Sequence, residues 1–170
     1  MKKLLTMSAA FILATGFQVM AQQPSSKFYS IQDSKYSLQF NKIIIEDDID
    51  VTLHESDEKS IHLEGRKEDI SAIKWKIKAG VLYLSSRSGS LKDKVLVTVD
   101  VSGLKQIEIN GASEVKSLGN LHSGPLDIYL NGYCYVNIKN AGKITLLNGE
   151  GIGLDIKKRS ANVLVSSGGA

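Results

Sequence analysis

Carboxylates are the groups in this chain best suited to chemistry, because paired acids hydrolyse glycosidic bonds and clustered acids bind Ca²⁺. Glu46, Asp47, Asp48 and Asp50 lie close together in the sequence. No glycine-containing loop with calcium-ligand spacing follows them, and acids of this kind are ordinary at a corner between strands. The sequence therefore predicts no metal and no cofactor at this cluster.

Histidine and cysteine offer the other common routes to chemistry. His54 and His62 lie on different predicted strands, and His122 is far from both, so neither an HxH nor an HExxH zinc spacing is present. Cys134 alternates with the apolar Val136 and is predicted to face the core as a small hydrophobe. The chain also lacks a nucleophile elbow, a P-loop and a dinucleotide fingerprint. We predict no catalytic residue.

Tyrosines form the surface feature that points most directly to binding. Tyr129, Tyr133 and Tyr135 lie opposite the apolar positions of one segment, and amphipathic rings are common contact residues for sugars and protein partners. We predict that these rings form an aromatic binding face for a protein or a glycan. The alternative is that they pack on neighbouring strands or beneath the N-terminal segment.

The elements that carry these tyrosines repeat along the chain. Asn110-Gly111, Asn131-Gly132 and Asn148-Gly149 each follow a β-rich run, and repeats of about 20 residues are typical of stacked units. Asn-Gly steps with positive φ could form hairpins of an antiparallel meander or sandwich, or the corners of a solenoid. The pattern after each step also recurs, because Ser113 and Val115 match Cys134 and Val136. This favours coils stacked in parallel.

Stacking would place equivalent positions about 4.8 Å apart, close to the separation of the carboxyls in a retaining glycosidase. No acid falls on another acid in these ladders, so we predict that the protein is not an enzyme. The predicted outward pairs are Gln106 on Asp127, Glu108 on Tyr129 and Leu146, Glu114 on Tyr135, and Lys116 on Asn137.

Strands are also expected before the repeats. Alternating apolar residues predict them over 43–46, 49–53, 60–64, 73–77, 81–84 and 95–101. Residues 67–72 could form one helical turn. The chain is thus expected to be all-β.

The first 21 residues resemble a signal peptide: Lys2 and Lys3 precede an apolar stretch, and Ala21 precedes the expected cleavage site. The stretch is too short for a good membrane span. We expect a polar segment over 22–37 and a single β domain over 38–170. Beyond residue 21 the chain has 19 basic and 18 acidic residues. This balance, with one basic run at Lys157-Lys158-Arg159, gives no reason to expect nucleic-acid binding.

From Phe40 to the C-terminus the chain resembles the head GIN domains of autotransporter adhesins, which are secreted mainly by Bacteroidota. The resemblance rests on the runs Phe40–Ile43, Ile49–Leu53, Ile61–Gly65, Gly80–Leu84, Val95–Val99 and Leu104–Ser113. It implies a right-handed single-stranded parallel β-helix, with more irregular N-terminal strands, and an exported, non-enzymatic role. The family has no established catalytic residues to transfer. Its members usually have more rungs than this chain.

These observations predict an exported, non-catalytic β-solenoid with a structural, adhesion or binding role in the periplasm, at the cell surface or outside the cell. A small carbohydrate-binding or carbohydrate-active β-helix is the alternative. After signal cleavage no segment is expected to span a membrane. The last strand, with Val163 and Val165, is expected to be an open edge that pairs with a second copy of the chain.

Overall fold

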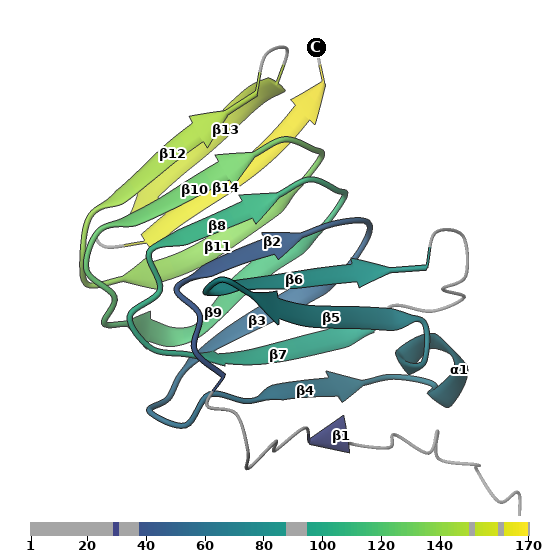
Figure 1. Ribbon diagram of the computed structural model, residues 1–170. Coiled ribbons are helices and arrows are strands. Elements are labelled where there is room, and N and C mark those ends of the chain that lie inside the picture. The colour runs from purple at the N-terminus through teal and green to yellow at the C-terminus, as the bar shows by residue number, and fades with distance from the viewer. Residues whose placement is uncertain (1–28, 31–37, 88–94, 150–151, 160–161, 170) are drawn as a thin grey trace, which may run out of the picture.

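The computed structural model describes residues 29–30, 38–87, 95–149, 152–159 and 162–169, and for 29–30, 152–159 and 162–169 it describes the backbone alone. The predicted signal peptide, the cleavage site and most of the polar segment over 22–37 lie outside these residues. The described chain is almost entirely β-structure, arranged as two sheets (Figure 1).

The eight-stranded sheet has the order β1-β4-β7-β3-β9-β11-β14-β13. Its strands are β1 (Tyr29–Ser30), β4 (Ile61–Glu64), β7 (Leu96–Val101), β3 (Asp50–Glu55), β9 (Glu114–Leu121), β11 (Tyr135–Asn140), β14 (Asn162–Gly169) and β13 (Ile152–Arg159). The six-stranded sheet has the order β12-β10-β8-β2-β6-β5. Its strands are β12 (Ile144–Asn148), β10 (Leu126–Leu130), β8 (Gln106–Ile109), β2 (Lys42–Ile45), β6 (Val81–Ser86) and β5 (Ile73–Lys78).

The prediction of a single-stranded parallel β-helix is wrong, because both sheets mix parallel and antiparallel pairs. In the six-stranded sheet β5 pairs antiparallel with β6, and in the eight-stranded sheet β4 pairs antiparallel with β7. The early strands β2 and β3 also lie inside their sheets, because β2 lies between β6 and β8 and β3 lies between β7 and β9. The repeat period is seen only after residue 106 and could not reveal this order.

The alternative of an antiparallel meander fails for a different reason. Strands β8 and β9 flank Asn110-Gly111 but belong to different sheets, and the same holds for β10 and β11 around Asn131-Gly132. Strands of successive repeats pair in parallel instead, β8 with β10 and β9 with β11. The steps Asn110-Gly111 and Asn131-Gly132 are therefore corners between the sheets.

The predicted outward pairs hold with one exception. Glu108 lies opposite Tyr129, and Glu114 lies opposite Tyr135. In β12 the register is shifted by one residue, so that Tyr129 lies opposite Leu147 and Leu146 lies opposite Ile128. A shift of one residue exchanges the two faces of a strand. Leu147 is consequently exposed, whereas Leu146 packs against the core.

One hydrophobic core lies between the sheets and takes side chains from both. Ile43 and Ile107 of the six-stranded sheet and Val51 and Val97 of the eight-stranded sheet are each at most 1% exposed. Cys134 is buried, as predicted. Each buried Val, Leu or Ile side chain contributes about 1.5–3 kcal/mol to folding, so this core is the main source of stability.

The predicted helical turn is present as α1 (Lys67–Ile70). Asp69 in this helix is 1% exposed, and its carboxylate accepts a hydrogen bond from Arg66 Nε over 2.8 Å. A buried carboxylate needs a cation of this kind to offset its lost hydration. The short helix connects β4 to β5 and so brings the chain from the eight-stranded to the six-stranded sheet (Figure 1).

The C-terminal strand is not at an edge of its sheet. β14 lies between β11 and β13, with Val165 opposite Val136 on one side and Ile156 on the other. The expectation that Val163 and Val165 form an open edge is therefore wrong, because the hairpin of β13 and β14 places β14 inside. Lys157-Lys158-Arg159 lies in strand β13 and not in a loop. Association with a second copy through this end stays a prediction.

Candidate functional site

The three predicted tyrosines do not form one face. Tyr129 lies on β10 of the six-stranded sheet, whereas Tyr135 lies on β11 of the eight-stranded sheet, and both point away from the core. Since the two sheets enclose the core, their outer faces look in opposite directions (Figure 1). Tyr133 lies on the connection between them and is 67% exposed. The sequence pattern correctly separated inward from outward residues but could not show which outward residues share a sheet.

Tyr129 shares its outer face of the six-stranded sheet with a second tyrosine, Tyr83. Paired positions run across the six-stranded sheet from Tyr129 to Glu108, Ile44 and Tyr83, and then to Lys76 on the edge strand β5. Alternation over 81–84 already placed Tyr83 opposite the buried Leu82 and Leu84. What the sequence could not supply was the pairing of β2 with both β6 and β8.

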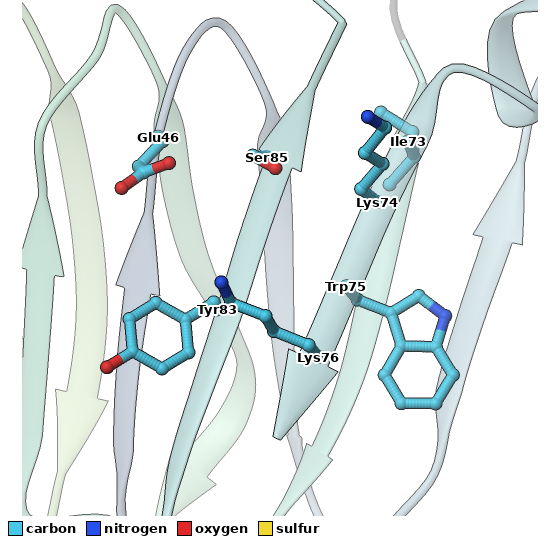
Figure 2. A pocket seen from close by; sticks show the side chains of 7 residues that line it. All are labelled: Glu46, Ile73, Lys74, Trp75, Lys76, Tyr83 and Ser85. Atoms are coloured by element: carbon cyan, nitrogen blue, oxygen red, sulfur yellow. The ribbon is translucent and has the colours of Figure 1, made fainter. Parts of the chain in front are cut away.

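A groove of about 560 Å³ lies around Tyr83 at one end of this row, and we call it the β5–β6 groove. Its lining residues are Glu46, Ile73, Lys74, Trp75, Lys76, Tyr83 and Ser85 (Figure 2). The Lys76 ammonium lies 5.0 Å from the centre of the Tyr83 ring, within the range of a cation–π interaction. The Trp75 ring points away from Tyr83 in Figure 2 and packs against the core.

The local sequence explains this geometry. In β5 the residues alternate between Ile73, Trp75 and Ile77 on one face and three exposed lysines on the other. A two-residue turn with positive φ at both Ala79 (51°) and Gly80 (76°) folds β6 back onto β5. These dihedrals fit a type I′ turn, whose twist matches that of the strands. Lys76 is thereby placed opposite Tyr83, and Lys74 opposite Ser85.

The chemical content of the β5–β6 groove suits binding better than catalysis. Lys74, Lys76 and Ser85 offer hydrogen-bond donors, and the Glu46 carboxylate offers an acceptor beside the Tyr83 ring. Glu46 is the only carboxylate among the described residues that line the groove, and hydrolysis of a glycosidic bond ordinarily needs a pair. An aromatic ring flanked by a few polar groups is a common arrangement in ligand sites.

A second polar cluster joins residues that the sequence kept apart. His54 on β3, His62 on β4 and Asp100 on β7 meet because β7 lies between the other two strands. His54 Nδ1 lies 2.7 Å from Asp100 Oδ1, Ser60 donates from Oγ to Asp100 Oδ2, and Ser60 Oγ lies 2.6 Å from His62 Nε2.

This cluster does not have the order of a hydrolytic triad. In a triad the carboxylate orients the histidine and the histidine contacts the serine. Here the carboxylate of Asp100 bonds Ser60 directly, and Ser60 is 9% exposed. A nucleophile with its proton held by a carboxylate and little access to solvent is poorly placed for attack. We interpret the cluster as a structural hydrogen-bond network across β4, β7 and β3.

The acids of the strand corner also have structural partners. Asp47 accepts the backbone N–H of Ser86, Asp48 that of Ala112, and Asp50 that of Glu114. Each carboxylate thus ties the corner between β2 and β3 to a neighbouring strand or corner. Within the part of the chain that the structure describes, no group of three or more metal-ligating side chains is found. The same residues contain no helix long and apolar enough to cross a membrane.

The chain matches a known protein family over most of its length. The family model described as "Putative auto-transporter adhesin, head GIN domain" matches residues 39–169. The chain belongs to the head GIN domain family. Comparison with curated proteins gives no match. The family assignment covers both sheets and the β5–β6 groove.

Solved structures support the fold of this head GIN domain. A "putative adhesin" from Bacteroides fragilis NCTC 9343 is 21% identical, with a TM-score of 0.57 over 74% of this chain and 60% of that one. A "putative adhesin" from Parabacteroides merdae ATCC 43184 is 18% identical, with a TM-score of 0.55 over 73% of this chain and 52% of that one. This chain therefore spans roughly half to three fifths of the length of these proteins. Their descriptions name adhesins and not enzymes.

Proposed function

We propose that this head GIN domain is an exported, non-catalytic binding module with an adhesion role at the cell envelope, and that its β5–β6 groove holds a saccharide. The observation that carries the proposal is the groove itself, where Tyr83 lies beside donors and an acceptor on a sheet face. Sugars present apolar ring faces and hydroxyls that both donate and accept, so they need this mixture of groups.

Export is supported by the signal-peptide pattern of residues 1–21 and by the adhesin descriptions of the family and its relatives. A saccharide ligand is favoured over an apolar one by the polar lining, in which four of the seven residues carry charged or hydroxyl side chains besides Tyr83: Glu46, Lys74, Lys76 and Ser85. The groove is also open to a polymer, because it lies on the outer face at the edge strand β5 (Figure 1).

Affinity electrophoresis of the purified protein tests this proposal. The gels would contain neutral polysaccharides (dextran, glucomannan) or acidic ones (alginate, polygalacturonate). We expect at least one polysaccharide to retard the wild-type protein, and we expect no release of reducing ends from that polysaccharide on prolonged incubation. Retardation by none of the four would count against a saccharide in the groove, and steady release of reducing ends would show an enzyme.

A further inference from the structure

A second pocket, separate from the β5–β6 groove, lies where several chain corners meet. It has a volume of about 390 Å³. Its walls come from the residues before β2, the connection from β3 to β4, the β5–β6 turn, and the connection from β7 to β8. The lining residues are Gln39, Phe40, Asn41, Lys59, Gly80, Ser102, Gly103 and Lys105. We call it the Lys59–Lys105 pocket.

The charge of this pocket has one sign. Among the described residues that line it, the two ionisable ones are both lysines and none is a carboxylate. Lys59 and Lys105 take part in none of the ion pairs found among the described residues. By contrast, Lys42 at the start of the neighbouring strand is neutralised by Glu108 at 2.8 Å. The pocket therefore concentrates positive charge without an acidic partner from the described chain.

Lys59 is held in place, although no acidic partner is found for it in the described part of the chain. Its ammonium donates to the backbone carbonyl of Phe40 over 2.8 Å and lies 4.9 Å from the centre of the Phe40 ring. Phe40 itself is 4% exposed and anchored in the core. Partial burial lowers the pKa of the Lys59 ammonium, since the charged form loses hydration. A desolvated cation of this kind gains from a bound anion.

The walls are fixed by backbone hydrogen bonds, so the pocket needs little rearrangement to accept a ligand. Asn41 donates its N–H to the carbonyl of Gly80, and its own carbonyl accepts the N–H groups of Lys105 and Gln106. Gly103 has a φ of +62° and nothing within 4 Å of where a side chain would begin. Preorganised walls reduce the entropic cost of binding.

We propose that the Lys59–Lys105 pocket binds an oxyanion, a carboxylate, sulfate or phosphate group of an extracellular ligand, through charge-assisted hydrogen bonds from the two ammonium groups. The pocket fits one such group with the small moiety that bears it. This site is distinct from the β5–β6 groove, whose lining includes the carboxylate of Glu46. Among the described residues, the Lys59 ammonium contacts the backbone carbonyl and the ring of Phe40. A bound anion would add the negatively charged partner that these two contacts do not provide.

Titrations at constant ionic strength test the proposal, with sodium sulfate, sodium phosphate and galacturonate as three separate probes and sodium chloride as compensating salt. Backbone amide resonances of Ser102 and Gly103 would report binding. We expect saturable shifts with at least one probe, and the tightest of the three identifies the source of the oxyanion. Lys105→Met, which changes an exposed side chain, should weaken that binding about tenfold or more, and Lys59→Met should do the same.

Lys116→Met is the matched control, because Lys116 is an exposed lysine on the outer face of the eight-stranded sheet. It should bind the probe as the wild type does. If Lys59→Met disturbs folding, the exposed Lys105→Met variant still decides the question. Linear, non-saturating shifts with all three probes, or equal weakening by Lys116→Met, would overturn the proposal. Tyr83→Ala should leave this binding unchanged, so that failure here and failure of the saccharide groove can be told apart.

Discussion

The α-carbon of Gly132 faces the backbone carbonyl of Gly111 so closely that a Cβ built on Gly132 would lie 2.5 Å from that oxygen. The corners of successive repeats are stacked directly on one another. A Cβ on Gly111 would in turn meet the backbone of Asp47. The side-chain amide of Asn131 also donates to Asn110 Oδ1 over 2.9 Å. Asn-Gly repeats here because the asparagines bond along the stack and the glycines permit the close approach.

Gly132→Ala should therefore reduce the free energy of unfolding by about 1–3 kcal/mol, the usual cost of forcing extra atoms into packed structure. The matched control is Gly124→Ala, because a Cβ at Gly124 meets no atom within 4 Å; its effect should be within about 0.5 kcal/mol. Chemical denaturation of both variants measures the difference. Equal stability of the two variants would show that the corners are not stacked this closely.

A substitution in the turn at Ala79-Gly80 should have the opposite effect and raise the stability of the fold. Ala79 has a φ of 51°, a left-handed conformation that costs a residue with a Cβ about 1–2 kcal/mol. Asparagine tolerates this conformation better and is favoured in type I′ turns. Ala79→Asn should raise the free energy of unfolding by about 0.5–1 kcal/mol. Ala141→Asn, at an exposed alanine with no positive φ, should not. A lower melting temperature for Ala79→Asn would contradict the turn assignment.

Asp100 should matter more than an ordinary surface acid. It accepts hydrogen bonds from His54 on the neighbouring strand β3 and from Ser60, which directly precedes the neighbouring strand β4. Asp100→Ala leaves both without their acceptor and should cost about 1–3 kcal/mol. Asp127→Ala, on the outer face of the six-stranded sheet, should cost less than about 0.5 kcal/mol. Denaturant titrations compare the two variants. An Asp100→Ala variant as stable as the wild type would show that the network adds nothing to stability.

Lys59 gives a pH dependence whose sign follows from burial. Since burial lowers the pKa of Lys59 in the folded state, the unfolded chain binds more protons at pH values between that lowered pKa and 10.5, the ordinary pKa of lysine. Its contribution to stability should therefore rise with pH across this interval, and the cost of the buried charge is present in full below it. The stability of the wild type minus that of Lys59→Met should increase as the pH is raised through this interval. A constant or falling difference would show that Lys59 is not desolvated.

Much of the local structure could be predicted from the sequence. Alternation placed the strands around Ile43, Val51 and Val97 and buried Cys134, because period-2 burial is a local property of a strand. The single helical turn near Lys67 was also predicted. These features depend on neighbours in the chain, which a single sequence shows directly.

The order of strands in the sheets could not be predicted in the same way. Nothing in the residues of β2 states that its neighbours are β6 and β8, since buried aliphatic strands pair with little specificity of sequence. For this reason the sequence could not show that Tyr129 and Tyr135 lie on different sheets and share no face. Binding through the individual tyrosines stays a prediction. The groove around Tyr83 and the meeting of His54 with Asp100 also depend on strands that are distant in sequence.

Isothermal titration calorimetry with the polysaccharide that retards the wild-type protein tests the proposed saccharide site most directly. It would compare the wild type with three variants: Tyr83→Ala, Lys76→Ala and Tyr135→Ala. Tyr83 and Lys76 line the β5–β6 groove, whereas Tyr135 is a 40% exposed tyrosine on the opposite sheet. We predict that Tyr83→Ala and Lys76→Ala each weaken binding about tenfold or more, and that Tyr135→Ala binds as tightly as the wild type. Unchanged binding by both groove variants, or loss of binding in Tyr135→Ala, would contradict a saccharide site in the β5–β6 groove.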